Sequence, residues 1–291
     1  ALTSLTSNHS SRNASLTHCE HTLARSEKSL NDLGSFTDIT VQIHEHVGLV
    51  EICRPPHNFF DHDLIKQLAD AMDLLDTKDS CRAVVLASQG RSFCAGAQFA
   101  SNHKGEAQYN MTNPGPLYVE AVRIFGNKKP IVAAIHGAAV GGGLGLSLVA
   151  DFRVACPEAR FVANFTKLGF HPGFGLTHTL PALIGQSNAA LMFYTSRRIK
   201  GEDALQMGLV DQLVHQDKVR ETALNLAKEI SECSPLGLIA TRATVRGDIA
   251  NRVKAATDIE LAEQMRLRET DDFAEGVKAV SERRSAKFLG R

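Results

Sequence analysis

Three glycines at positions 141–143 could offer backbone N–H groups to a ligand, because they fall where one apolar run ends and another begins. The run Ile131–Ile135 before them predicts a buried strand, and LGLSLVA after them predicts a buried helix over 142–150. The first amides of a helix have no partner within it and lie at the positive end of its dipole. Such a turn suits a phosphate or a developing oxyanion, although a tight turn in a packed core would use the same residues.

Two nucleotide-binding patterns do not match this turn. It is not a GxGxxG motif with an acidic residue about 20 positions further on, and no GK[ST] follows it. The glycines are therefore not expected to hold a dinucleotide or a nucleoside triphosphate.

A second apolar run, RAVVLAS at 82–88, also predicts a buried strand, and it leads into GRSFCAGAQ at 90–98. Together the two stretches resemble the crotonase superfamily, the enoyl-CoA hydratases and isomerases. The pattern of that family joins F-x-A-G-A/G-D to a later K-P-x-x-A-A-x-x-G-x-x-x-G-G-G, and both halves occur here in order. The resemblance covers residues 36–291. It implies an α/β fold, a crotonase-like spiral of ββα units with a C-terminal helical trimerisation region.

The chain is expected to have three parts. Residues 1–35 are rich in Ser, Thr, Asn and His and predict a mobile polar N-terminal extension. Residues 36–215 correspond to the spiral core of the family and residues 216–291 to its C-terminal helical region. Because the terminal helices of the family pack on neighbouring subunits, the resemblance implies a homotrimer or a hexamer.

Hydrophobic periodicity and turn signals predict the elements that position these motifs. They predict a hairpin at 39–43 and 48–53, a helix capped by Asp61, a helix at 116–125, strands at 152–155 and 161–163, a helix at 174–197, a short helix at 201–207, a strand at 209–214 and helices from 217 onwards.

The resemblance implies an oxyanion hole made of two backbone N–H groups, which by motif belong to Ala97 and Gly142. In the family these groups bind a thioester carbonyl and stabilise the enolate that forms beside it. Each such donor is typically worth about 3 kcal/mol of transition-state stabilisation. Because the donors are backbone groups, the motif specifies small residues and not acids.

The acids of the family do not occur at the matching positions of this chain. Hydratases place one glutamate where this chain has Gly145 and a second where it has Phe165. An aspartate of the dehalogenases and dienoyl-CoA isomerases falls on Gly173. His171 matches an aspartate of the naphthoate synthases and is predicted to be the acid or base, since imidazole titrates near neutral pH. A role in capping the next helix is the alternative for His171.

The same resemblance implies the remaining candidate site residues. The groups predicted to bind the substrate are Arg91, Gln98, Phe99, Phe165, Phe174 and Arg284. Cys94 is expected to be a small buried residue, His136 and Asp151 are expected to be structural, and Tyr118, Glu120 or Glu106 could point into the site.

Composition also indicates which kinds of binding partner and which cellular location to expect. Formal net charge is zero over 291 residues, which argues against nucleic acid as a bulk partner. No apolar run is long enough to predict a membrane span. The six cysteines show no CxxC and indicate a reducing, cytoplasmic location. The first eighteen residues lack acids and contain Arg12, so a mitochondrial location is the alternative. No metal and no separate cofactor are expected, because coenzyme A would enter as part of the substrate.

These observations favour an acyl-CoA-binding enzyme, a lyase or isomerase of fatty-acid-type thioesters, that stabilises an enolate without the hydratase glutamate pair. One alternative is a hydrolase of cyclic β-diketones, a branch of the family that works without CoA and relies on His and Asp. Another is a non-catalytic acyl-CoA-binding protein.

Overall fold

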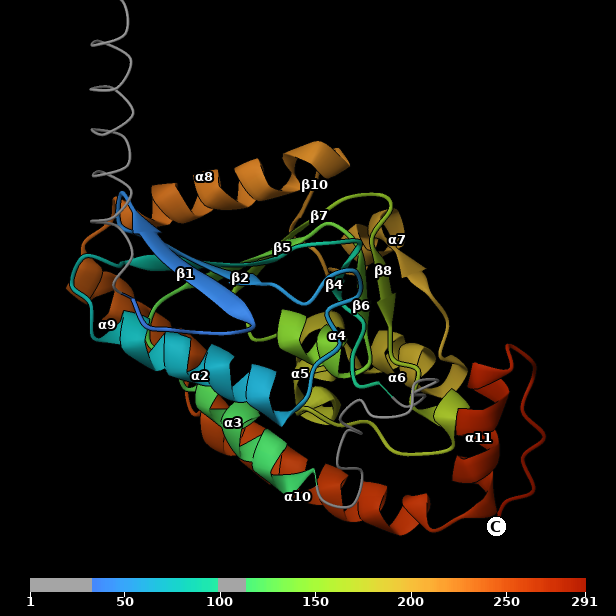
Figure 1. Ribbon diagram of the computed structural model, residues 1–291. Helices are drawn as coiled ribbons and strands as arrows, with labels where there is room; N and C mark the ends of the chain where they lie inside the picture. The colour runs from blue at the N-terminus through green and yellow to red at the C-terminus, as the bar shows by residue number, and fades with distance from the viewer. Residues whose placement is uncertain (1–32, 99–113) are drawn as a thin grey trace, which may run out of the picture. The chain divides into compact units, whose positions relative to one another are not determined.

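A computed structural model describes residues 33–98 and 114–291 (Figure 1). The chain divides into two units, Ala1–Ser35 and Phe36–Arg291, and the fold below is that of the second unit. Phe99, Glu106 and most of the expected N-terminal extension lie outside the described residues.

A six-stranded sheet has the order β1-β2-β3-β5-β7-β10. Its strands are β1 (Ile39–His44), β2 (Val47–Ile52), β3 (Ala83–Ser88), β5 (Ile131–Ile135), β7 (Phe152–Ala155) and β10 (Gln212–Leu213). The first two form the predicted antiparallel hairpin, and the other neighbours pair in parallel. β3 and β5 are buried along their whole length, as parallel strands covered on both faces must be.

A second sheet has the order β4-β6-β8-β9. Its strands are β4 (Ser92–Cys94), β6 (Ala138–Val140), β8 (Arg160–Val162) and β9 (Ile199–Lys200). β4, β6 and β8 are parallel, and each follows closely after β3, β5 or β7. β8 was predicted from the sequence, whereas β4 and β6 were not, because these two short strands lie within the glycine motifs, where the turn signals dominate the pattern.

The strand pairs and the helices after them form a repeat. α3 (Gly115–Phe125) follows β4, α4 (Gly142–Ser147) follows β6, and α5 (Leu176–Ile184) follows β8 after the short helix η1 (Thr166–Leu168). A ββα unit therefore occurs three times in succession, which confirms the fold class that the resemblance implied.

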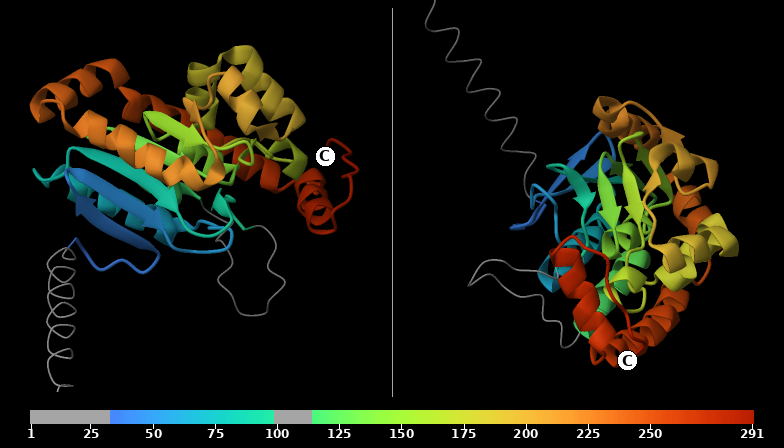
Figure 2. Two further views of the ribbon diagram at one scale, coloured as in Figure 1. Left: turned by 90° about the horizontal axis from the view of Figure 1, so that it is seen from above. Right: turned by 90° about the vertical axis from the view of Figure 1, so that its right-hand side faces the viewer.

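Helices cover both faces of the six-stranded sheet (Figures 1 and 2). α8 (Val219–Ser231) packs on one face against β3, β5 and β7, and α2 (His62–Asp76) lies on the other face beside β1 and β2. α2 starts at Asp61 as predicted, and the Asp61 carboxylate accepts a hydrogen bond from the amide of Leu64 at 2.9 Å.

Three elements are shorter than the sequence predicts. α4 ends at Ser147 and not at residue 150, because the chain turns there so that the Asp151 amide can donate to Ile131 O at 2.8 Å and β7 can begin. The expected helix at 174–197 is split at Gly185, whose φ of 79° and ψ of 159° are not helical. The expected strand at 209–214 is reduced to β10, which pairs with β7 over two residues.

The other helices come from the second half of the chain. They are α6 (Gln186–Thr195), α7 (Gly201–Gln206), η2 (Gln216–Lys218), α9 (Pro235–Arg246), α10 (Ile249–Arg268) and α11 (Asp271–Ser281). α10 packs on α3 and α5, and α11 packs on η1. In the described residues, no helix has the length and apolar character needed to cross a membrane.

Candidate functional site

A cavity lies where the loop after β4, the turn before α4 and the segment after β8 come together. Ala97 and Gly142 line it, together with Phe60, Phe165 and Phe174. The structure therefore brings together both predicted oxyanion-hole residues and two of the predicted substrate-binding residues. Phe60 was missed, since it is a single aromatic residue after a proline-containing turn.

The amides of Ala97 and Gly142 differ from the neighbouring amides in their hydrogen bonding. The amide of Ala95 donates to His57 O at 3.0 Å, and that of Gly141 donates to Val162 O at 2.8 Å. Within the described part of the chain, no group accepts a hydrogen bond from the amide of Ala97 or Gly142. Neither N–H group is therefore bound to another described residue.

Close packing explains why the turn before α4 is made of glycine. A Cβ atom on Gly142 would lie 2.2 Å from Phe60 Cζ, and one on Gly143 would lie 2.1 Å from Cys94 O. Gly141 has a φ of 55°, which favours glycine. The turn reaches the loop after β4, since a Cβ on Gly96 would lie 3.7 Å from the Gly142 nitrogen.

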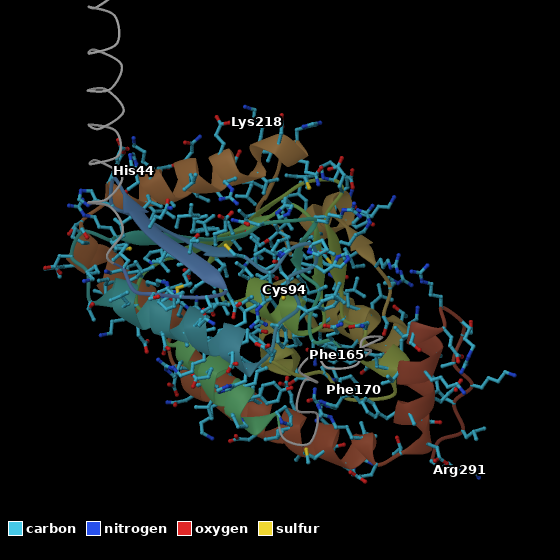
Figure 3. All side chains as sticks on the ribbon, in the orientation of Figure 1. His44, Cys94, Phe165, Phe170, Lys218 and Arg291 are labelled. Carbon is cyan, nitrogen blue, oxygen red and sulfur yellow. The ribbon has the colours of Figure 1, made fainter. Side chains whose placement is uncertain are left out.

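Aromatic rings form the walls of the cavity. The ring centroids of Phe60 and Phe174 are 5.8 Å apart, and those of Phe165 and Phe170 are 5.7 Å apart. The last two side chains lie next to each other in Figure 3. Walls of this kind suit an apolar acyl group and keep water away from a developing charge.

Phe174 occupies the space next to Gly145, the first position at which the resemblance led us to expect an acid. A Cβ on Gly145 would lie 2.8 Å from Phe174 Cβ and Cδ1. The φ of Phe174 is 63°, an uncommon value for a large side chain, and its neighbour Gly175 has a φ of 74°. A longer side chain at position 145 would therefore have to displace Phe174.

Tyr118 occupies the space next to Gly173, where the resemblance to the dehalogenases and dienoyl-CoA isomerases led us to expect an aspartate. A Cβ on Gly173 would lie 2.0 Å from the Tyr118 hydroxyl oxygen. This hydroxyl donates to Gln264 Oε1 at 2.8 Å, and Gln264 Nε2 donates to His171 O at 2.9 Å. Tyr118 therefore points inward, whereas Glu120 forms an ion pair with Arg123 and does not line the cavity.

Three further residues in the cavity wall were missed by the sequence analysis. Asn164 lies beside Gly141, and Gln264 and Arg268 reach the cavity from α10. The guanidinium carbon of Arg268 lies 6.0 Å from the centroid of the Phe170 ring. No local pattern could have identified the last two, because α10 is distant in sequence from the glycine motifs.

His171 lies outside this cavity. It lines a second cavity of about 410 Å³ with Thr166, Pro181 and Phe193. Its Nδ1 atom is 2.8 Å from Pro172 O, and because a carbonyl only accepts, that nitrogen carries the proton. His171 does not cap α5 either, since the side chain that accepts from the amides at the start of α5 is that of Glu260.

The predicted CoA-binding side chains are not in the cavity wall. Arg91 and Gln98 are exposed and do not line it. Arg284 forms ion pairs with Glu275 and Glu282 at the end of α11. The resemblance matched these residues by their place in a sequence motif, which does not determine where their side chains point.

The side chains expected to be structural have structural contacts. Burial raises the pKa of the Cys94 thiol to about 12, so this group stays protonated beneath the loop. His136 Nε2 donates to Gly90 O at 3.0 Å. The Asp151 carboxylate accepts from the amide of Ile131 at 2.8 Å and from Arg242 at 2.9 Å.

Comparison with known proteins gives related chains over nearly the whole described fold. The sequence model of the enoyl-CoA hydratase/isomerase family matches residues 42–291. A probable enoyl-CoA hydratase of Bacillus subtilis is 30% identical over 256 residues, which cover 87% of this chain and 98% of that protein. The 1,2-epoxyphenylacetyl-CoA isomerase of Escherichia coli is 28% identical over 263 residues, with 87% of this chain and 98% of that protein covered.

A solved structure has the same fold. The carnitinyl-CoA hydratase of Mycobacterium avium superposes with a TM-score of 0.77 at 28% identity, covering 88% of this chain and 100% of that one. The matched region contains both glycine motifs, the cavity between them and α10. The chain is thus a member of the enoyl-CoA hydratase/isomerase family.

Proposed function

We propose that this enzyme binds an acyl-CoA thioester and holds its carbonyl oxygen between the amides of Ala97 and Gly142. The observation that carries the proposal is that these two residues line one cavity and that their N–H groups have no acceptor within the described chain. Related proteins are named for acyl-CoA substrates, among them the isomerase of Escherichia coli.

The amides would act on charge that develops during the reaction. When the carbon next to the thioester loses a proton, the electron pair moves onto the carbonyl oxygen, and the oxygen gains negative charge as an enolate. Two fixed N–H donors stabilise that charge more than the neutral carbonyl, and each contributes about 3 kcal/mol to lowering the barrier. The phenylalanine walls exclude water and strengthen both hydrogen bonds.

The reaction we propose does not use a glutamate pair to add water. Positions 145 and 165 are glycine and phenylalanine, and in the described lining of the cavity there is no carboxylate and no imidazole. The polar side chains there are Tyr118, Asn164, Gln264 and Arg268. Among the described residues, proton transfer therefore falls to Tyr118 or to the substrate, which favours isomerisation or C–C bond chemistry over hydration.

The same lining argues against the CoA-independent alternative. Hydrolysis of cyclic β-diketones was expected to rely on His and Asp side chains. Neither type lines the cavity among the described residues, and His171 lines a different one.

Hydrogen exchange in heavy water tests the proposal. The enzyme is incubated with butyryl-CoA or phenylacetyl-CoA in D₂O, and deuterium on the carbon next to the thioester is measured by mass spectrometry. We expect incorporation that depends on the enzyme. Tight binding of both thioesters with no incorporation would instead favour a non-catalytic acyl-CoA-binding protein.

A further inference from the structure

Glu260 on α10 is a fully buried carboxylate that the proposed chemistry does not use. One of its oxygens accepts from the amide of Gly175 at 2.7 Å. The other accepts from the amide of Thr177 at 2.8 Å and from its hydroxyl at 2.7 Å. Within the described chain, Glu260 forms no ion pair with Lys or Arg, so these three donors are what offsets its loss of hydration.

The three hydrogen bonds hold a segment that has an uncommon backbone conformation. Phe174 and Gly175 both have positive φ, and such a conformation persists only where surrounding contacts impose it. One turn further along α10, Gln264 donates to His171 O at 2.9 Å. α10 therefore fixes the segment 171–177 at both ends.

The segment carries part of the cavity wall. Phe174 lies between the rings of Phe60 and Phe125, at centroid distances of 5.8 Å and 6.5 Å, and it fills the space beside Gly145. A shift of Gly175 relative to α10 would move the Phe174 ring within the cavity that the Gly142 amide lines.

We propose that Glu260 is a positioning residue, which sets the shape of the acyl-binding cavity by fixing Gly175 and Thr177 and through them Phe174. The inference rests on the proposed function, since it concerns the acyl group of the thioester. Glu260 itself does not line the cavity and has no contact with a ligand there. Its replacement should therefore affect the acyl group and leave the binding of coenzyme A itself unchanged.

Glu260→Gln is a sharp test, because an amide cannot replace the carboxylate here. A glutamine has a single acceptor oxygen, and its NH₂ group would face an N–H donor on either side. Glu263→Gln is the matched control on the same helix. The Glu263 side chain is 39% exposed and forms its ion pair with Arg266 on the same helix.

Calorimetric titration with butyryl-CoA and with coenzyme A separates the two effects. We expect Glu260→Gln to bind butyryl-CoA about tenfold more weakly, with the affinity for coenzyme A within about twofold of wild type. Glu263→Gln should change neither affinity. An equal loss for both ligands, or no loss for either, would overturn the inference.

A double-mutant cycle tests the link through the phenylalanine. If Glu260 acts through Phe174, the effect of Glu260→Gln on butyryl-CoA affinity should largely disappear in a Phe174→Ala background. Additive effects would mean that Glu260 does not act through this ring.

Amide hydrogen exchange, measured on the protein without ligand, tests the role of Glu260 independently of the proposed function. We expect exchange in peptides covering 172–177 to be about tenfold faster in Glu260→Gln than in Glu263→Gln, because glutamine keeps one acceptor oxygen and so leaves either the Gly175 or the Thr177 N–H group without its acceptor. Equal protection would overturn the inference even if butyryl-CoA binds. Wild-type protein that fails to bind butyryl-CoA would instead count against the proposed function.

A milder substitution covers the case in which Glu260→Gln does not fold. Thr177→Val removes only the hydroxyl donor, and Thr177→Ser keeps it. The valine variant should lose affinity for butyryl-CoA relative to the serine variant, in the same direction as Glu260→Gln, and equal affinities would contradict the inference.

Discussion

Two glycines, Gly145 beneath Phe174 and Gly173 in the cavity wall, lie at positions where relatives of this enzyme were expected to carry acids. Each is backed by a large side chain, Phe174 in one case and Tyr118 in the other. A side chain at either position would have to occupy the volume that the aromatic residue fills in this structure. An acid introduced there would therefore have to displace the aromatic residue.

Gly145→Glu is therefore expected to destabilise the protein without creating a hydratase. The new side chain must displace Phe174 from a packed position, which should lower the free energy of unfolding by about 2 kcal/mol or more. Crotonyl-CoA hydration should remain orders of magnitude below that of a glutamate-bearing hydratase. Chemical denaturation and a spectrophotometric hydration assay provide the two measurements.

Gly237→Ala on α9 is the control for this substitution. The nearest atom to a Cβ there is 3.6 Å away, so the helix propensity of alanine should make this variant as stable as wild type or slightly more so. A Gly145→Glu protein of wild-type stability, or one that hydrates crotonyl-CoA rapidly, would show that Phe174 moves aside easily.

The thiols provide a second test at the level of single residues. Because burial raises the pKa of Cys94 to about 12, this thiol should remain unmodified by iodoacetamide at pH 8 in the folded protein. Cys233 is exposed and should be alkylated under the same conditions. Peptide mass spectrometry distinguishes the two sites, and rapid alkylation of Cys94 would contradict the packing beneath the loop.

At the level of secondary structure, the sequence predicted the long and strongly patterned elements well. The hairpin, α2, α3, β3 and β5 all combine clear periodicity with a cap or turn signal. β4 and β6 were not predicted, because their pairing comes from the neighbouring strand and not from their own residues. The lengths of α4 and β10 were also set by the turns of the chain around them.

Some residues of the candidate site could likewise be predicted from the sequence, and others could not. The glycine motifs predicted that Ala97 and Gly142 lie together, and both line one cavity, because close backbone packing requires glycine at identifiable positions. The sequence did not predict roles for Gln264 and Glu260, because only the packing of α10 on α3 and α5 brings these residues close to the cavity and to the segment 171–177. The proton-transfer role predicted for His171 rested on alignment, and the structure places this side chain in another cavity.

Asp151 joins β5 to α9 and should be important for stability. Its carboxylate accepts from the amide of Ile131 and from the largely buried guanidinium groups of Arg242 and Arg246. Asp151→Asn leaves two cations without their counterion, so the free energy of unfolding should fall by about 3 kcal/mol. Asp258→Asn, in an exposed pair with Lys254, should cost less than about 1 kcal/mol. Similar losses in urea denaturation would contradict this assignment.

At the scale of the whole molecule, the C-terminal helices differ in the surface that they cover. α8 packs on the six-stranded sheet. α9 and α10 instead expose large apolar side chains, with Leu236 81%, Val245 79% and Ile259 65% exposed. Exposed apolar side chains on neighbouring helices are typical of surfaces that bind another protein chain. They support the proposal that the enzyme is a homotrimer or a hexamer.

The oligomeric state can be measured by light scattering after size-exclusion chromatography. We expect a mass of three or six chains of 31.5 kDa at micromolar concentration. Combining Leu236→Glu with Val245→Glu should reduce that mass while circular dichroism stays unchanged. A wild-type monomer, or an oligomer that the two charges leave intact, would show that this surface is not the interface.

The central claim is that the amides of Ala97 and Gly142 together bind a thioester carbonyl. Difference infrared spectroscopy with butyryl-CoA labelled with ¹³C at the carbonyl measures this bond directly. In wild-type protein, the carbonyl stretch should lie at lower frequency than in water, because two fixed N–H donors polarise the bond. Gly142→Pro removes one donor and should return part of the shift, whereas Gly142→Ala keeps the donor and controls for crowding against Phe60. A bound carbonyl that absorbs at the same frequency as in water, or one that Gly142→Pro does not alter relative to Gly142→Ala, would contradict the account.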